Sequence, residues 1–235
     1  MDISVILPTY CECGNIEQLI TAIEDSLLQD RDACMAEIIV VDDNSPDGTA
    51  QVVQTHQPRP GVTVTCLIRT AERGLATAIK YGILQSTGDR IVVMDTDFNH
   101  SPSNLPEMIH LLDRHDLVIG SRFVKGGGME DRARYRYSQL YNLFIQSILW
   151  QDIRDSLSGF FAMRRTALLA MDLDRIFTGY GEYFIRLTYL ARRCGLNIIE
   201  VPVFYTLRKS GFSKSNFTHM IRDYTLCAIN LRIKS

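Results

Sequence analysis

The sequence predicts an α/β protein whose mostly parallel central sheet is covered by helices on both faces. Short runs of valine and isoleucine alternate with amphipathic, helix-length segments through the first half of the chain. Continuous apolar runs, each followed by a helix, are typical of parallel strands that are buried on both faces. Polar residues follow several of these runs directly, and open α/β sheets bind ligands at the carboxyl ends of their strands.

Each element follows from these local patterns. The expected strands span 3–8, 36–43, 62–69, 89–95, 116–122 and 197–205. The expected helices span 15–29, 45–56, 74–86, 104–114, 132–150, about 180–194 and the last residues of the chain. Ser45 or Asp47 is suited to cap the second helix. We find no repeat or linker, so we expect one domain over residues 1–235, in which 123–235 adds elements to the sheet begun by 1–122.

The composition limits the classes of function. Of the 235 residues, 46% are hydrophobic and 22% are charged, and the formal net charge is −2. This charge argues against nucleic acid as a partner. No run approaches the roughly 18 apolar residues of a membrane helix, and we expect no secretory signal at the start. The six cysteines form no CxxC and no zinc spacing, so we expect reduced thiols in a cytoplasmic protein.

The stretch VVMDTDFNHSP, residues 92–102, suggests a metal site. Its apolar run ends at Asp95, and Asp97 lies two residues further on. Both carboxylates can therefore reach one site at the edge of the sheet. Close oxygen ligands suit Mg²⁺ or Mn²⁺, because Mg²⁺ is usually bound by one or two carboxylates together with substrate phosphates.

The ends of the first two strands also carry polar residues. The first ends in PTYCE, in which Pro8 fixes the backbone, Tyr10 offers an aromatic face and Glu12 offers an acceptor. The second ends in VVDDNSPDGT, where the Asp43 carboxylate can hydrogen-bond a ribose or a base. Three such strand ends together predict a nucleotide pocket. The chain has no GxGxxG after its first strand and no GxxxxGK[ST], which argues against dinucleotide dehydrogenases and P-loop enzymes.

Eight sequence blocks follow one another in the order ILPTYCE, VVDDNSPDGT, RGLATA, MDTDFNHSP, GSRFVKGGG, SGF, EVPVFY and RKSGFSK. In this order they resemble inverting family 2 glycosyltransferases, and in particular the polyprenyl-phosphate sugar transferases, which include dolichol-phosphate mannosyltransferases. The resemblance covers the chain from residue 3 to about residue 216. The resemblance implies a GT-A fold, with a nucleotide-sugar-binding half over 1–122 and an acceptor-binding half over 123–235. It also implies a divalent metal that assists transfer of one sugar from a nucleotide sugar to a lipid phosphate.

The resemblance implies a set of residues for the donor. The nucleoside would be held by Pro8, Tyr10, Glu12, Val41 and Asp43.

A second set would lie around the metal and the diphosphate. Arg122 of GSR would face the phosphates at the reaction centre. Asn99 stands where relatives more often carry Gln or Ser, and it keeps an oxygen donor. The residues around the metal would be Asp95, Thr96, Asp97 and Asn99, with Asp97 and Asn99 as the preferred direct ligands.

The remaining implied residues belong to the acceptor and to a closing loop. Arg134 and Ser138 have the R-x-x-x-S spacing that grips the acceptor phosphate in the family. Arg208 and Lys214 would close over the diphosphate, and Gly211 between them suits a loop that moves. A phosphate acceptor is already an anion, so no general base is assigned.

Several alternatives stay open at this stage. The donor is a GDP- or UDP-sugar and the sugar is of the mannose or glucose type. One rival function is transfer to a hydroxyl acceptor, which would need a base such as Glu182. Another is a non-catalytic nucleotide-sugar-binding subunit. The segment 132–150 is basic and aromatic at its start and apolar afterwards, which suits either a core helix or an interfacial one. We expect a peripheral enzyme on the cytoplasmic membrane face, seated on the membrane surface directly or through a small membrane subunit.

Overall fold

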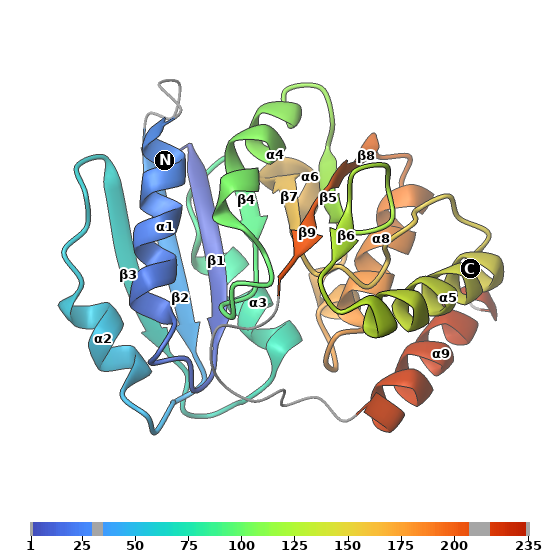
Figure 1. The fold of residues 1–235 in the computed structure, drawn as a ribbon, viewed down its shortest axis with the longest axis horizontal. Helices are drawn as coiled ribbons and strands as arrows, with labels where there is room; N and C mark the ends of the chain where they lie inside the picture. The colour runs from blue at the N-terminus through green and yellow to red at the C-terminus, as the bar shows by residue number, and fades with distance from the viewer. Residues whose placement is uncertain (1, 30–34, 207–216, 234–235) are drawn as a thin grey trace.

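A seven-stranded sheet forms the centre of the computed structural model, which describes residues 2–29, 35–206 and 217–233 (Figure 1). The strand order is β3-β2-β1-β4-β7-β5-β8. Every paired strand is parallel except β7, which runs antiparallel to β4 and β5. The bounds are β1 Ile3–Thr9, β2 Ala36–Asp42, β3 Val62–Ile68, β4 Arg90–Val93, β5 Leu117–Ser121, β7 Phe161–Arg164 and β8 Ile198–Pro202. The expected mostly parallel α/β sheet is therefore confirmed.

Helices follow most of the strands and lie on both sides of the sheet (Figure 1). A short second sheet pairs β6 with β9 in parallel. The bounds of these elements are α1 Ile16–Gln29, α2 Thr49–Thr55, α3 Leu75–Gln85, η1 Pro102–Asn104, α4 Leu105–Leu111, β6 Gly128–Met129, α5 Arg132–Leu149, α6 Arg165–Leu169, α7 Leu173–Ile176, α8 Tyr183–Arg193, β9 Phe204–Tyr205 and α9 Phe217–Ile233.

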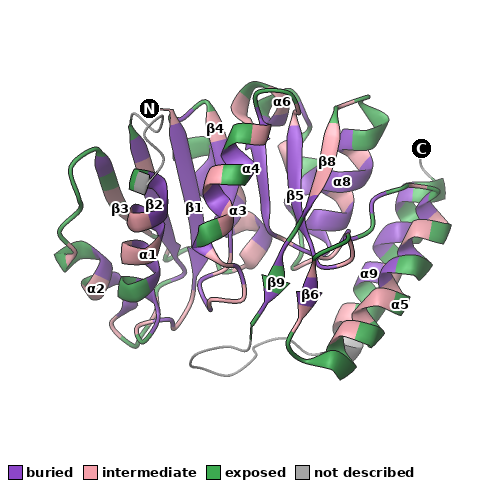
Figure 2. Ribbon diagram, turned by 45° about the horizontal axis from the view of Figure 1, so that its top comes forward, coloured by how far each residue is buried: buried purple, intermediate pink, exposed green. Residues whose placement is uncertain are grey.

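Alternate side chains of the strands face two separate apolar cores. Val5 and Leu7 of β1 pack in one core with residues of α1 and α4. Ile6 packs in the other with residues of α3 and α8. All seven residues of β1 are buried, and Figure 2 shows the central strands as buried along most of their length. Each fully buried Val, Leu or Ile side chain contributes about 1.5–3 kcal/mol, so the two cores fix the sheet whose strand ends build the site.

Helices α5 and α9 form a third layer beside the β5–β8 end of the sheet (Figures 1 and 2). A separate apolar cluster joins them to α8, with Ile145 of α5, Tyr189 of α8 and Ala228 of α9 among its buried members. Asp131 caps α5, since its side chain accepts a hydrogen bond from the backbone N–H of Arg134. The basic start of α5 lies close to the end of β5, where the Tyr135 hydroxyl donates to the Arg122 carbonyl at 3.5 Å.

The structure differs from the expected elements in three places. The segment 197–205 is not one strand, because β8 ends at Pro202 and β9 pairs with β6 in the other sheet. Val203 N still donates to Ser121 O of β5 at 3.1 Å, and the chain then crosses to β6, where Gly128 N donates to Val203 O at 3.0 Å. The central strand β7 was not expected at all, because a four-residue segment, FAMR, is too short to show a period. The helix expected over 104–114 is shorter, since α4 covers Leu105–Leu111.

Candidate active site

The ends of β1, β2 and β4 enclose a cavity of about 420 Å³, here called the strand-end cavity. Its wall includes seven of the residues predicted to hold the donor or the metal. The described residues that line it are Pro8, Thr9, Tyr10, Glu12, Asp43, Arg73, Gly74, Leu75, Ala78, Asp95, Thr96, Asp97 and Tyr180.

Each of the three loops that leave these strands contains a non-glycine residue in the left-handed region. These are Cys11 after β1, Asn44 after β2 and Phe98 after β4, with φ values of 55°, 56° and 64°. Among the described residues only Trp150 shares this feature elsewhere. Such backbone costs about 1–3 kcal/mol per residue and clusters at functional sites. The surrounding structure therefore holds the turns around the cavity in strained shapes.

The two aspartates of the DxD motif differ in exposure. The Asp95 side chain is 43% exposed, whereas Asp97 is buried. The Asp97 carboxylate accepts hydrogen bonds from the backbone N–H of Asn99 at 3.1 Å and from its Nδ2 at 2.8 Å. Asn99 therefore turns a donor toward Asp97, and it is not among the described residues that line the cavity. The structure brings Asp95 and Asp97 together on the wall, while the Asn99 amide is hydrogen-bonded to Asp97.

The donor set at this wall fits a hard divalent cation. Asp95, Asp97 and the Thr96 hydroxyl between them offer only oxygen ligands. Within residues 2–29, 35–206 and 217–233 there is no group of three or more His, Cys, Asp or Glu side chains suited to a metal. Two carboxylates open to a cavity match Mg²⁺ or Mn²⁺, because such ions complete their coordination with water and substrate phosphates.

Asp43 lines the cavity, but its carboxylate is engaged by a neighbouring loop. Arg69 Nε donates to Oδ1 at 2.7 Å and the backbone N–H of Gly74 donates to Oδ2 at 2.8 Å. Arg69 also donates to the Gly74 carbonyl at 3.0 Å. Asp43 thus holds segment 69–74 against the end of β2, and this shapes one side of the cavity.

The other predicted nucleoside contacts vary in position. Tyr10 lines the cavity, and the guanidinium of Arg73 lies 4.0 Å from its ring centroid. Glu12 also lines it, while Asn15 Nδ2 donates to its carboxylate at 2.8 Å. Val41 is fully buried in the apolar core next to α3. Sequence reasoning missed Arg73, although the RGLATA block contained it.

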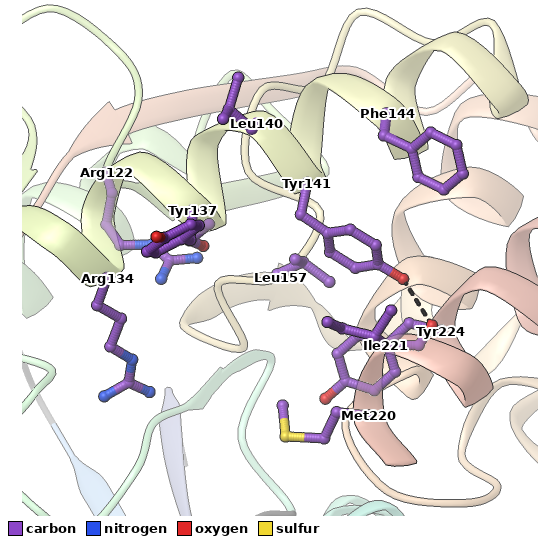
Figure 3. Close-up of a pocket in the computed structure, with 11 residues that line it drawn as sticks. Arg122, Arg134, Tyr137, Leu140, Tyr141, Phe144, Leu157, Met220, Ile221 and Tyr224 are labelled. Carbon is purple, nitrogen blue, oxygen red and sulfur yellow. Dashed lines mark hydrogen bonds between the residues drawn. The ribbon is translucent and has the colours of Figure 1, made fainter. Parts of the chain in front are cut away.

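A second cavity, of about 730 Å³, lies between α5 and α9, and we call it the helix cavity (Figure 3). Arg122 and Arg134 gather at one end, while apolar and aromatic side chains cover the rest. Tyr141 crosses between the helices, with its hydroxyl donating to Ile221 O at 3.0 Å. The lining residues are Arg122, Arg134, Tyr137, Ser138, Leu140, Tyr141, Phe144, Leu157, Met220, Ile221 and Tyr224. The predicted acceptor residues Arg134 and Ser138 therefore share one cavity with Arg122.

Arg122 forms a buried ion pair with Asp155. Its Nε and Nη2 donate to the two carboxylate oxygens at 2.8 and 2.7 Å, and its backbone N–H donates to Oδ2 at 3.0 Å. Burial alone would lower the pKa of the Arg122 guanidinium, but the charge and hydrogen bonds of Asp155 raise it above its ordinary value. The guanidinium also lies 4.8 Å from the ring centroid of Tyr205. Arg122 is therefore a fixed, permanent cation at the head of the helix cavity.

His100 is fully buried beside the DxD loop. Its Nδ1 accepts a hydrogen bond from the backbone N–H of Asp95 at 2.9 Å. Burial lowers the pKa of His100 to about 4, with Asp97 acting in the opposite direction. The ring stacks on Phe160 and contacts Tyr205. A neutral histidine thus joins the DxD loop to the ring that packs on Arg122.

Two predicted residues and one possible base remain. Arg208 and Lys214 lie outside the described residues, as does Gly211 between them. Glu182 is described and is not among the residues that line either cavity. Its carboxylate accepts from Tyr180 N at 3.0 Å and lies 3.6 Å from Arg186 Nη2.

Comparisons with known proteins agree with this geometry. The model of the family described as glycosyl transferase family 2 matches residues 4–170. The chain is 35% identical over 221 residues to the dolichol-phosphate mannosyltransferase of Pyrococcus furiosus. The aligned region covers 91% of this chain and 59% of that relative. It is 34% identical to the undecaprenyl-phosphate mannosyltransferase of Micrococcus luteus, over 91% of this chain and 87% of the relative. The chain belongs to glycosyltransferase family 2 and is a transferase.

The fold is also similar to that of solved structures. Glucosyl-3-phosphoglycerate synthase from Mycobacterium tuberculosis, in complex with Mn²⁺, uridine diphosphate and glucosyl-3-phosphoglycerate, superposes with a TM-score of 0.68. The match covers 98% of this chain and 79% of that chain at 21% identity. At this identity the likeness shows the architecture alone, and it confirms the expected GT-A type of fold.

The buried Arg122–Asp155 pair generates a stability prediction. We expect Asp155→Ala to lower the free energy of unfolding by about 3–5 kcal/mol, because the Arg122 charge would stay buried without its partner. The matched control is Asp152→Ala, which removes an exposed ion pair with Arg192. The side chain of Asp152 is 71% exposed and that of Arg192 is 52% exposed. Exposed pairs contribute about 0–1 kcal/mol. Denaturant unfolding measures both changes, and equal losses would contradict the assignment.

Proposed function

We propose that the protein is a metal-dependent, inverting glycosyltransferase that moves a hexose of the mannose or glucose type from a GDP- or UDP-sugar to a polyprenyl or dolichyl phosphate. The observation that carries this proposal is the contrast between the two cavities. One presents carboxylates and an aromatic face, and the other presents two arginines at the head of a long apolar lining. A nucleotide sugar suits the first and an amphipathic lipid phosphate suits the second.

On the donor side, the wall of the strand-end cavity would bind and orient the nucleotide. Tyr10 and Arg73 offer flat faces against which a base can stack, and Glu12 offers an acceptor. Asp95 and Asp97 would hold Mg²⁺ or Mn²⁺ beside the diphosphate. When bound, the cation would neutralise charge that develops on the leaving diphosphate. The complex of the Mycobacterium tuberculosis synthase with Mn²⁺ and uridine diphosphate supports this use of the fold.

On the acceptor side, a phosphate oxygen would attack the anomeric carbon as the bond from that carbon to the diphosphate breaks. The electron pair of that bond leaves with the nucleoside diphosphate. Arg134 and Ser138 would bind the acceptor phosphate, while Arg122 adds a fixed positive charge nearby. The planar guanidinium group matches phosphate oxygens. Because this acceptor is already an anion, the step needs no general base.

The rival with a hydroxyl acceptor receives less support. Its candidate base, Glu182, accepts from a backbone N–H and lies near Arg186, and it is not among the described lining residues. The names of the relatives from Pyrococcus furiosus and Micrococcus luteus also favour a lipid phosphate. A non-catalytic subunit would not require both the carboxylate pair and the arginine-headed cavity.

The exposed side chains of α5 and α9 support the proposal that the protein binds to a membrane surface. Within the described part of the chain, no helix is long and apolar enough to cross a bilayer. Large apolar side chains are nevertheless exposed along both helices, beside arginines at the start of α5 and on α9. The exposed apolar members are Tyr137, Leu140, Leu143, Phe144, Ile221, Leu226, Ile229 and Ile233. We propose that this helix face lies on the cytoplasmic side of a membrane and opens the helix cavity to its lipid.

A donor screen tests the proposed reaction. We expect sugar from one GDP- or UDP-hexose to enter the lipid phase with undecaprenyl or dolichyl phosphate in detergent, and EDTA to stop the transfer. Asp97→Ala should abolish this turnover, because a ligand of the metal is lost. Asp174→Ala, at an exposed position, is the control and should leave turnover unchanged. Donor hydrolysis without lipid product would instead favour a hydroxyl acceptor.

The acceptor assignment has its own test. We expect Arg134→Ala to raise KM for the lipid phosphate by about 10- to 100-fold, since hydrogen bonds to charged groups contribute about 1.5–3 kcal/mol. The affinity for the donor should change little. Arg136→Ala is the matched control, because Arg136 is exposed on the same helix and is not among the described lining residues. An equal loss of donor and acceptor binding would contradict the role of Arg134.

Vesicle binding tests whether the exposed face of α5 and α9 binds a membrane surface. We expect Leu140→Glu and Phe144→Glu each to weaken sedimentation with anionic vesicles by about tenfold or more, because burial of one large apolar side chain is worth about 1.5–3 kcal/mol. Leu84→Glu is the control, since Leu84 is 50% exposed on α3. Equal binding by all three variants would count against this face.

A further inference from the structure

We propose that His100 is the positioning residue for Asp95, and that its single ring holds both the main chain and the carboxylate of that aspartate when a divalent cation and a nucleoside diphosphate fill the strand-end cavity. This inference rests on the proposed function, because it concerns the loaded site. It concerns a residue that neither the sequence motifs nor the comparisons assigned.

The ring of His100 is held in place from several sides. It is 0% exposed. Its centroid lies 4.8 Å from that of Phe160 at an interplanar angle of 10°, and 4.9 Å from that of Tyr205 at 59°. Tyr205 is itself fixed, because its hydroxyl lies 3.0 Å from the Ser158 carbonyl and 2.9 Å from the Ser158 Oγ. A ring packed in this way can orient another group without moving itself.

The two ring nitrogens face the same aspartate. Nδ1 accepts the backbone N–H of Asp95 at 2.9 Å, so in the neutral ring the proton lies on Nε2. Among the described residues, Nε2 has no hydrogen-bond partner although it is buried. It lies 3.7 Å from Oδ2 of Asp95. A buried donor without a partner is rare in native proteins and calls for an explanation.

The Asp95 carboxylate is the group that can supply the missing acceptor. Charge-assisted hydrogen bonds of this kind measure about 2.7–2.9 Å, so Oδ2 lies about 1 Å beyond that range. In the loaded site, Oδ2 would approach Nε2 to hydrogen-bond distance while the carboxylate stays on the wall of the cavity. Groups that ligate metals are commonly oriented by such an outer hydrogen bond. His100 would therefore select one orientation of Asp95 for the cation.

A purely structural role is the rival explanation. The Ser158 main chain also acts on the pKa of His100, and a small shift of the ring would let Nε2–H donate to the Ser158 carbonyl alone. The Tyr205 hydroxyl already donates to this carbonyl at 3.0 Å. If the rival were correct, changes at His100 would alter the stability of the fold but not its affinity for a cation.

Two substitutions separate the functions of the two nitrogens. The side-chain oxygen of asparagine occupies about the place of Nδ1, whereas the side-chain amide nitrogen of glutamine reaches about the place of Nε2. Both remove the stacked ring. We expect His100→Asn to weaken Mn²⁺ binding by about 10- to 100-fold, the usual effect of losing an outer hydrogen bond at a metal site. We expect His100→Gln to retain most of the affinity. His110→Gln, at an exposed position on α4, is the matched control and should bind as the unmodified protein does.

The measurement is a Mn²⁺ titration followed by electron paramagnetic resonance, with GDP and with UDP in separate series, and with the free energy of unfolding recorded for each variant. Unchanged Mn²⁺ affinity in His100→Asn, or equal losses in both variants, would overturn the role of His100 alone. If the unmodified protein binds no Mn²⁺ with either nucleotide, the proposed metal site fails and this inference fails with it.

A second measurement uses the unmodified protein and does not depend on the folding of any variant. Nitrogen-detected and proton NMR can follow the Nε2–H of His100 while Mg²⁺ is added with the nucleotide that binds. We expect this proton signal to move downfield as the hydrogen bond to Asp95 shortens. A signal that stays unchanged at saturating Mg²⁺ would overturn the proposal.

Discussion

The buried ion pair of Arg122 and Asp155 is the interaction on which the rest of the site depends. It joins the end of β5 to the segment that precedes β7, and Asp155 N is held in turn by Glu200 of β8. Tyr205 packs on the guanidinium and on His100, so the same cluster reaches the DxD loop. A positive charge kept fixed in this way can act on an anion without reorganising, which is how enzymes stabilise charge most effectively.

The antiparallel strand β7 explains how one sheet can support two cavities of opposite chemistry. It lies between β4, whose end carries the DxD motif, and β5, whose end carries Arg122. The strand-end cavity therefore uses strand ends on one side of β7, and the helix cavity begins on the other. The third layer of α5 and α9 then adds an apolar wall that the sheet itself does not offer.

The sequence predicted the strand ends better than the contacts made there. Runs of valine and isoleucine located β1, β2 and β4, and the polar residues after them do line one cavity. The engagement of Asp43 by Arg69 could not be predicted, because it joins the loops after β2 and β3, which are far apart in the sequence. The contacts of His100 could not be predicted either, since spacing alone does not reveal which atom each ring nitrogen faces. The helix cavity could not be predicted from the sequence either, because it depends on how α5 and α9 pack against each other.

The left-handed backbone at Cys11 and Phe98 has a consequence for how such a chain can change. Glycine adopts this conformation at little cost, so a lineage selected only for thermal robustness would tend to acquire glycine at both positions. The side chains at these two positions keep the loops rigid, because glycine would widen the range of backbone conformations available to them. The chain therefore accepts some strain, and with it a lower stability to heat, in return for rigid loops. Substitutions that aim to raise the thermal stability should therefore avoid these two turns and be placed at the opposite edge of the sheet.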